Sequence, residues 1–171
     1  EAIEQALLLK LEDNQYYFSL LAEMHKMDGD HQLDINNLEL ALAMVENIEA
    51  TEDNTTQLED AANLHHTLAL RYFESGDQPS AFAHVEQAIA HRDTLKTHDV
   101  ENYSYALDLV WSRLLQIKLF IQTQQYDQGL VVLAQTDEVI DLLVQNRSGA
   151  KPVVQAQAWS MLLNSQILFN L

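Results

Sequence analysis

The side chains of this chain that could bind a metal are seven histidines and one carboxylate-rich turn. His84, His91 and His98 recur every seven residues, so they lie along one side of a helix with a drift of about 20° per step. Seven helical residues rise about 10 Å, whereas two imidazoles that share one ion must each approach it to about 2 Å. His65 and His66 are adjacent and point to different sides of a helix. No metal site is therefore expected from the histidines.

Residues 28 to 39 have the spacing of a calcium-binding loop between two helices. Oxygen-bearing side chains stand at its first, third, fifth, ninth and twelfth positions, namely Asp28, Asp30, Gln32, Asn36 and Glu39. The sixth position is Leu33, although the sharp bend of such a loop requires glycine there. An acidic turn between helices is the competing interpretation and the one we expect, so no metal or other cofactor is predicted.

Catalytic motifs are missing from the sequence. The chain has no cysteine, which removes thiolate catalysis, disulfides and Cys-ligated zinc. It also lacks G-x-S-x-G, H-E-x-x-H and a glycine-rich phosphate loop, and its 26 acidic residues are typical of solvated helix faces. The sequence therefore predicts a protein that is not an enzyme.

The composition favours helices and disfavours several classes of partner. Four glycines and two prolines supply few of the tight turns that a β-sandwich needs. A net charge of −17 repels phosphate backbones and anionic lipid, so direct binding to nucleic acid or to a membrane is not expected. Because no apolar run is long enough to cross a bilayer, we expect a cytoplasmic protein, with a periplasmic sensor domain of a membrane protein as the alternative.

Amphipathic patterns predict about seven helices, at residues 2–27, 34–50, 56–76, 79–97, 99–124, 127–146 and 152–171. The expected N-terminal caps are Asp34, Thr56 in a capping box with Glu59, Asp99 and Asp127. The last helix has no charged residue after Lys151, and its apolar side chains occupy more than one face. We therefore expect it to be covered by further chain, favoured here, or by a second copy in a homodimer or a partner.

One pattern of residues returns along the chain at a fixed period. Gly29, Gly76 and Gln124 hold the same turn position, in steps of 47 and 48 residues, and each stands eight residues after the start of a corresponding pair, Leu21-Ala22, Leu68-Ala69 and Gln116-Ile117. A period of this size indicates helical hairpins that bury their apolar faces by stacking on one another. The chain is thus expected to be a single array over 1–171, with hairpins at about 2–50, 56–97 and 100–146 and a final helix at about 152–171.

Residues 62 to 93 carry a more specific pattern, formed by Leu68-Ala69, Tyr72, Gly76-Asp77, Ala81, Val85 and Ala88. This pattern resembles the tetratricopeptide repeat. The step exceeds the usual 34 residues, which is similar to the longer-helix arrays of bacterial signalling and transcription-regulating proteins. The resemblance implies an all-α fold of antiparallel hairpins stacked as an α-solenoid, and HEAT-type repeats are the architectural alternative.

In arrays of this family the first helix of each hairpin lines a concave surface. Carried over to this chain, the partner-binding groove comprises Tyr16, Ser19, Glu23, Asn63, His66, Leu70, Trp111, Leu114 and Lys118. Packing between repeats is the competing interpretation of such positions. The resemblance implies a regulatory or sensor module that binds a protein or peptide. The alternatives are a helical small-molecule sensor with an enclosed pocket and, third, an enzyme.

Overall fold

The computed structural model describes residues 31–47, 54–146 and 149–171, and these ranges contain six α-helices and no strand. The helices are α3 (His31–Glu46), α4 (Thr55–Ser75), α5 (Gln78–His98), α6 (Tyr103–Gln122), α7 (Tyr126–Asn146) and α8 (Lys151–Asn170). The predicted all-α class is confirmed. The helix expected at 2–27, which carries Tyr16, Ser19 and Glu23, lies outside the described residues.

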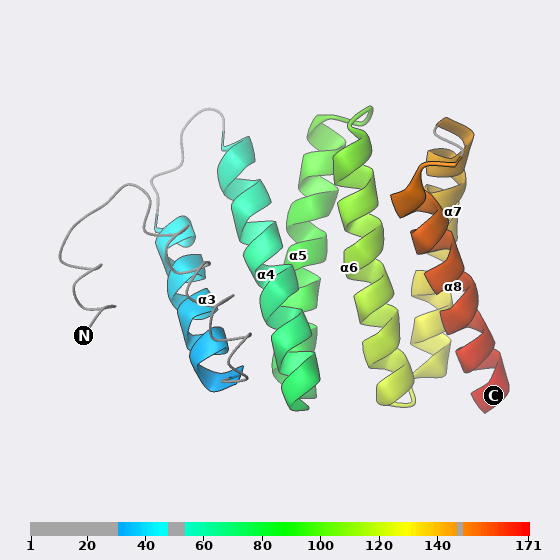
Figure 1. Cartoon of the computed structure of the whole chain (residues 1–171), viewed down its shortest axis with the longest axis horizontal. Coiled ribbons are helices and arrows are strands. Elements are labelled where there is room, and N and C mark those ends of the chain that lie inside the picture. Colours follow the sequence, from blue (N-terminus) through cyan, green and yellow to red (C-terminus); the bar gives the residue numbers. More distant parts are fainter. Residues whose placement is uncertain (1–30, 48–53, 147–148) are drawn as a thin grey trace.

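The six helices stand side by side in chain order, with α3 at one side and α7 and α8 at the other (Figure 1). Each helix packs on the next one, and α4–α6 and α6–α8 are also in contact. Buried apolar side chains form three clusters along this row, one between α3 and α4, one among α4, α5 and α6, and one among α6, α7 and α8. The core is therefore distributed between neighbouring helices.

Small residues stand where helices approach closely. Ala69 of α4 and Ala81 of α5 have no exposed surface and belong to the same apolar cluster, as the repeat pattern predicts. Gly129 of α7 is buried, and a Cβ added there would lie 3.2 Å from Ile167 Cδ1 and 3.5 Å from Phe120 Cβ. The backbone of α7 therefore packs closely against α6 and α8, and a methyl group at this position would require Ile167 to shift by a few tenths of an ångström.

The α4–α5 and α6–α7 turns have the same geometry. Gly76 and Gln124 both adopt a positive φ, of 84° and 59°. The N–H after Gly76 donates to the Tyr72 carbonyl at 2.9 Å, and the N–H after Gln124 donates to the Phe120 carbonyl at 2.8 Å. The predicted equivalence of positions 76 and 124 is thus seen in the backbone, even though glutamine adopts this conformation less readily than glycine does.

The four expected caps, Asp34, Thr56, Asp99 and Asp127, are wrong, and long-range packing explains the first of them. Asp34 does not cap a helix, because α3 already begins at His31 and Asp34 lies buried in its first turn. Its carboxylate forms an ion pair with Arg71 Nε of α4, which is also buried. The capping box of Thr56 is wrong as well, since α4 begins at Thr55 after Asn54.

The other displaced start is that of α6. Asp99 ends α5, and its Oδ1 accepts a hydrogen bond from the N–H of Glu101. Asn102 is the cap, because its Oδ1 accepts from the N–H groups of Ser104 and Tyr105. Asp127 lies in the first turn of α7, one residue after the start of that helix.

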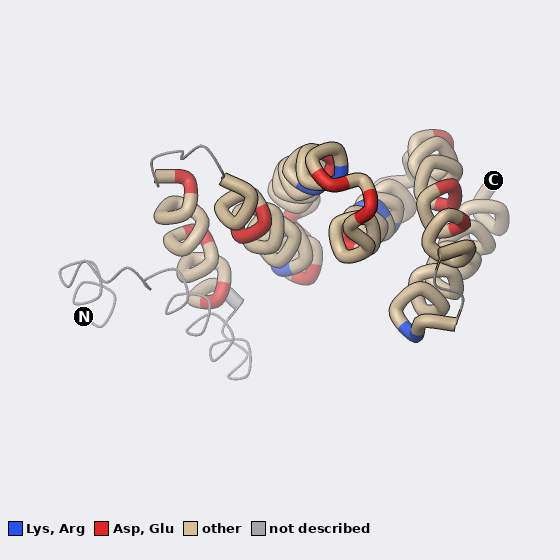
Figure 2. Tube along the Cα trace, turned by 90° about the horizontal axis from the view of Figure 1, so that it is seen from above, with Lys and Arg blue, Asp and Glu red and all other residues tan. Residues whose placement is uncertain are grey.

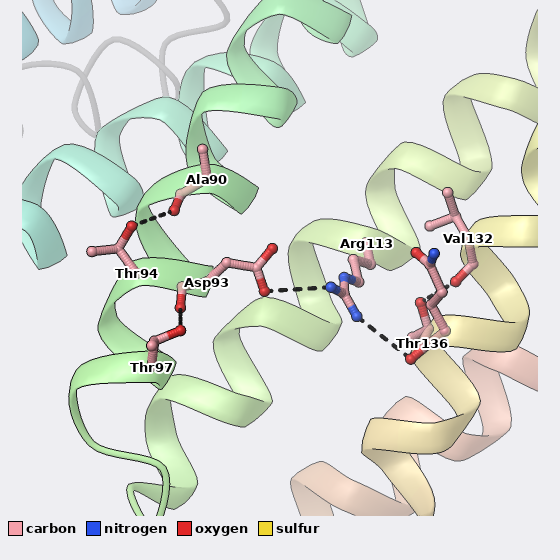
Figure 3. Close-up of polar contacts among 8 residues, drawn as sticks. Ala90, Asp93, Thr94, Thr97, Arg113, Val132 and Thr136 are labelled. Carbon is pink, nitrogen blue, oxygen red and sulfur yellow. Dashed lines mark hydrogen bonds and ion pairs between the residues drawn. The ribbon is translucent and has the colours of Figure 1, made fainter.

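Polar contacts join α6 to the helices on both sides. The Arg113 guanidinium reaches Asp93 of α5 and the backbone carbonyl of Gln135 in α7, both at 3.4 Å (Figure 3). Thr136 donates to the Val132 carbonyl four residues earlier at 2.6 Å, which satisfies this buried hydroxyl within its own helix. Arg113 therefore links three consecutive helices.

The outer face of α8 is apolar and uncharged. Acidic positions are spread over the tube in Figure 2, whereas α8 carries one charged residue, Lys151 at its start. Its buried residues pack on α6 and α7, but large apolar side chains of the helix and of the residue after it remain exposed, namely Val154, Trp159, Met161, Leu162, Leu168, Phe169 and Leu171. None of the six described helices has an apolar stretch long enough to cross a bilayer.

Candidate functional site

A pocket of about 250 Å³ lies between α4, α6 and α8, and we call it the tryptophan pocket. Its lining residues are His66, Leu70, Trp111, Leu114, Leu115, Lys118, Trp159 and Leu163. Most of them are three, four or seven residues apart within their helix, and Leu114 and Leu115 are adjacent, so each helix turns one face toward the pocket. The three helices are the first members of the second, third and fourth predicted units.

Apolar groups form the floor of the pocket, and aromatic and polar groups form its rim. Leu114, Leu115 and Leu163 are buried, with at most 5% of their surface exposed. Trp159 of α8 is 43% exposed, and Trp111 of α6 is half-buried. These are the two tryptophans of the chain. A concave apolar surface with aromatic walls is a typical binding site for a bulky apolar group.

Lys118 places a positive charge at the rim of the tryptophan pocket. Its Nζ lies 4.9 Å from the ring centroid of Phe73 and 5.7 Å from that of Trp159. Both distances are within the range of cation–π attraction. Within the described part of the chain no carboxylate pairs with this ammonium, and none of the eight lining residues is acidic. The pocket is therefore locally cationic in a chain with a net charge of −17.

A hydrogen-bond chain behind the pocket fixes His66. His66 Nδ1 lies 3.0 Å from Ser112 Oγ, and Arg92 Nη1 donates to the same buried hydroxyl. The pKa of His66 is lowered to about 4, first by burial and then by the positive charge of Arg92. His66 is accordingly neutral at pH 7.

Arg92 is itself a buried cation, held by α4 and α6 from its position on α5. Its guanidinium donates to the backbone carbonyl of Asp108 at 2.7 Å and to Asn63 Oδ1 at 3.1 Å. Burial lowers the pKa of Arg92 and raises that of the Asp108 carboxyl. A small polar cavity of about 160 Å³ adjoins these groups and is also lined by Glu59. This cluster joins three helices and positions His66 through Ser112.

Three of the histidines named in the sequence, His65, His84 and His91, meet in a second cluster, apart from His66 and His98. His65 of α4 lies between two histidines of α5, with its Nδ1 2.9 Å from that of His84 and its ring stacked 5.6 Å from His91. His84 also stacks on Tyr72, whose hydroxyl donates to Glu39 of α3. Burial lowers the pKa of all three histidines, that of His65 to about 4. Among the described residues no three metal-ligating side chains are placed to hold an ion.

The calcium-loop candidate does not have a loop conformation over the positions that are described. Gln32, Asn36 and Glu39 all lie within α3, and Gln32 Nε2 donates to Asn36 Oδ1 along the helix. Asp28 and Asp30 lie outside the described residues. A helix separates these three oxygens along its axis, which does not match the loop that the calcium candidate requires.

Five of the groove residues named from the sequence meet at the tryptophan pocket, namely His66, Leu70, Trp111, Leu114 and Lys118. Asn63 does not, because its side chain turns to Arg92. Sequence reasoning missed Leu115, Trp159 and Leu163. A signal for Trp159 was available, since it follows Trp111 by the same 48 residues that separate the two turns.

We compared the chain with protein-family models, with curated proteins and with solved structures, and none of them matches it.

Proposed function

We propose that this chain is a tetratricopeptide-like α-solenoid that acts as a regulatory or sensory module of a bacterial signalling or transcription-regulating protein. Its function is to bind a segment of another protein without catalysis. The observation that carries the proposal is the tryptophan pocket, in which alternate helices α4, α6 and α8 present Trp111, Trp159 and Lys118 to one hollow. Tryptophan and cationic side chains at the centre of a concave surface are typical of binding hot spots.

The packing of the helices supports the solenoid. Each helix contacts its neighbours in the chain, and the turns at Gly76 and Gln124 repeat one geometry 48 residues apart. Side chains on alternate helices then face the same side, as the contacts of α4 with α6 and of α6 with α8 require. A rigid row of this kind presents a preorganised surface, which reduces the entropy lost on binding.

A small-molecule sensor remains the second candidate, because the tryptophan pocket has room for about one aromatic group. A further cavity, of about 390 Å³, lies where the α5–α6 turn meets the end of α7 and is lined by Tyr103, Leu142 and Leu143 among others. A ligand enclosed in that cavity would favour this function over peptide binding.

Selection of displayed peptides tests the proposal. A random peptide library is selected on the wild-type protein, and the enriched peptides are measured against Trp111→Ala and Trp159→Ala. We expect each replacement to weaken binding by about tenfold or more, since hot-spot truncations cost about 2 kcal/mol or more. Val131→Ala is the matched control, because Val131 is an exposed apolar residue on α7 outside the pocket. Peptides that bind the tryptophan variants and the wild type equally would refute the proposal.

A further inference from the structure

We infer that the tryptophan pocket recognises a protein segment in which a bulky apolar side chain is flanked by an acidic one. The inference rests on the proposed function and specifies the chemistry of the partner. It depends on one property of the pocket, which is that the polar groups at its rim are hydrogen-bond donors.

Lys118 is the first of these donors. An ammonium group carries three N–H bonds and no acceptor, and here it contacts the faces of Phe73 and Trp159 instead of a carboxylate. Of the 26 acidic residues of the chain, none that the structure describes pairs with Lys118, so its charge is left to be neutralised by another group. A carboxylate of the bound segment would supply that charge.

His66 is the second donor. Arg92 donates to the oxygen of Ser112, and we assign the hydroxyl hydrogen of Ser112 to the nearby Nδ1 of His66. A neutral imidazole that accepts at Nδ1 carries its hydrogen at Nε2, and Nε2 has no partner among the described residues. In this assignment His66 offers an N–H to the pocket.

The indole N–H groups of Trp111 and Trp159 complete the set, because an indole nitrogen is a donor only. The remaining lining groups are the leucine side chains of the floor, which require an apolar occupant. A volume of about 250 Å³ suits one phenyl or leucyl side chain and the adjacent part of its backbone. The apolar side chain and the hydrogen-bond acceptor must therefore lie close together in the bound segment.

The net charge of the chain makes this preference diagnostic. At −17 the protein as a whole repels acidic peptides, so a non-specific surface would favour the neutral member of any acid–amide pair. In 0.15 M salt that repulsion is screened beyond about 8 Å, whereas a contact with Lys118 is not. Tighter binding of an acidic peptide than of its amide counterpart would then indicate a contact in the pocket itself.

The experiment is a titration followed by NMR on the indole N–H signals of the full chain labelled with ¹⁵N, since the two tryptophans are both in the pocket. The probes are a capped heptapeptide with Glu-Phe-Glu at its centre, the same peptide with Gln-Phe-Gln, and free phenylacetate. We expect the acidic peptide to bind at least about tenfold more tightly than its amide counterpart, the factor that one charge-assisted hydrogen bond supplies. Free phenylacetate should bind more weakly than the acidic peptide.

Variants assign the effect to the side chain. Lys118→Gln should reduce the ratio of the two affinities to near one, and Lys118→Arg should restore it. Lys151→Gln removes an exposed lysine at the start of α8 and should leave the ratio unchanged. Thermal unfolding of each variant shows that the fold is retained, and the affinity ratio within one variant is independent of small changes in stability.

Each alternative outcome has a separate meaning. Equal affinity for the acidic and amide peptides would overturn the inference and leave the peptide-binding groove intact. Binding of phenylacetate with no binding of either peptide would overturn both the peptide source and the proposed function, in favour of a small-molecule sensor. Indole signals that respond to no probe would remove the pocket as a site for this chemistry, and peptide selection would then decide separately whether the groove has a partner.

Discussion

The histidine cluster between α3, α4 and α5 should make the stability of the protein depend on pH. His65 is 5% exposed and lies against His84 and His91 on one side and Glu46 on the other, 3.6 Å from its Nε2. The short contact between the Nδ1 atoms of His65 and His84 requires one nitrogen to donate and the other to accept. Protonation of both rings would place two N–H groups and two charges face to face.

The size of the effect follows from the pKa of His65. Its pKa is about 4 in the folded protein and 6.5 in the unfolded chain, so between these values the unfolded chain binds more protons. The free energy of unfolding that neutral His65 contributes is therefore fully present above pH 6.5, and it decreases as the pH falls toward 4. At pH 5 this one group should cost about 2 kcal/mol of unfolding free energy relative to pH 8.

Urea denaturation followed by circular dichroism at pH 8 and pH 5 measures this loss. Acidic residues also titrate near pH 5, so the informative quantity is the difference between wild type and His65→Gln. The variant should lose about 2 kcal/mol less than wild type on acidification, whatever its stability at pH 8. His98→Gln, at the exposed end of α5, should behave as wild type. The same loss in wild type and His65→Gln would refute the argument.

Three further replacements test the packing, each by the free energy of unfolding in urea. Ala81→Glu should destabilise the protein by at least about 3 kcal/mol, because it buries an unpaired charge at the α4–α5 crossing. The control, Ala83→Glu on the exposed side of α5, should change the free energy of unfolding by about 0.5 kcal/mol or less. Similar values for the two variants would contradict the assignment of Ala81 to the buried face. Arg71→Met removes the cation that faces buried Asp34 and should cost about 3 kcal/mol, and a neutral result would mean that this pair does not hold α3 on α4. Gln124→Gly should stabilise by about 0.5–1 kcal/mol, since glycine adopts its positive φ without strain, and a loss of stability would argue against this turn geometry.

Features that depend on a few neighbouring residues could be predicted from the sequence. The turn at Gln124 was recognisable from its register with Gly76, although its side chain gives no hint of a positive φ. Helix starts were less predictable, because Asp99 and Asn102 are both good caps and stand three residues apart. Asp99 forms a local turn with the N–H of Glu101, which leaves the capping role to Asn102.

Features that depend on contacts between distant residues could not be predicted in this way. The role of Arg92 cannot be predicted from the sequence, because its partners Asn63 and Ser112 lie 29 and 20 residues away in the chain. The meeting of His65 with His84 and His91 is of the same kind, since it depends on the rotation of α4 about its axis. The residue type of Asp34 favours a cap, and only the position of Arg71 on α4 accounts for its burial.

The close contact at Gly129 means that the hairpins cannot be exchanged freely, although their turns are alike. Where α5 has Ala81, α7 has Gly129, and a methyl group added to Gly129 would lie only 3.2 Å from Ile167 Cδ1. If gene duplication inserted another α4–α5 unit directly before α8, its alanine would meet that isoleucine, and a compensating change to a smaller side chain would be needed. The contact between Gly129 and Ile167 thus favours the present order of the helices over one with an α5-like helix next to α8.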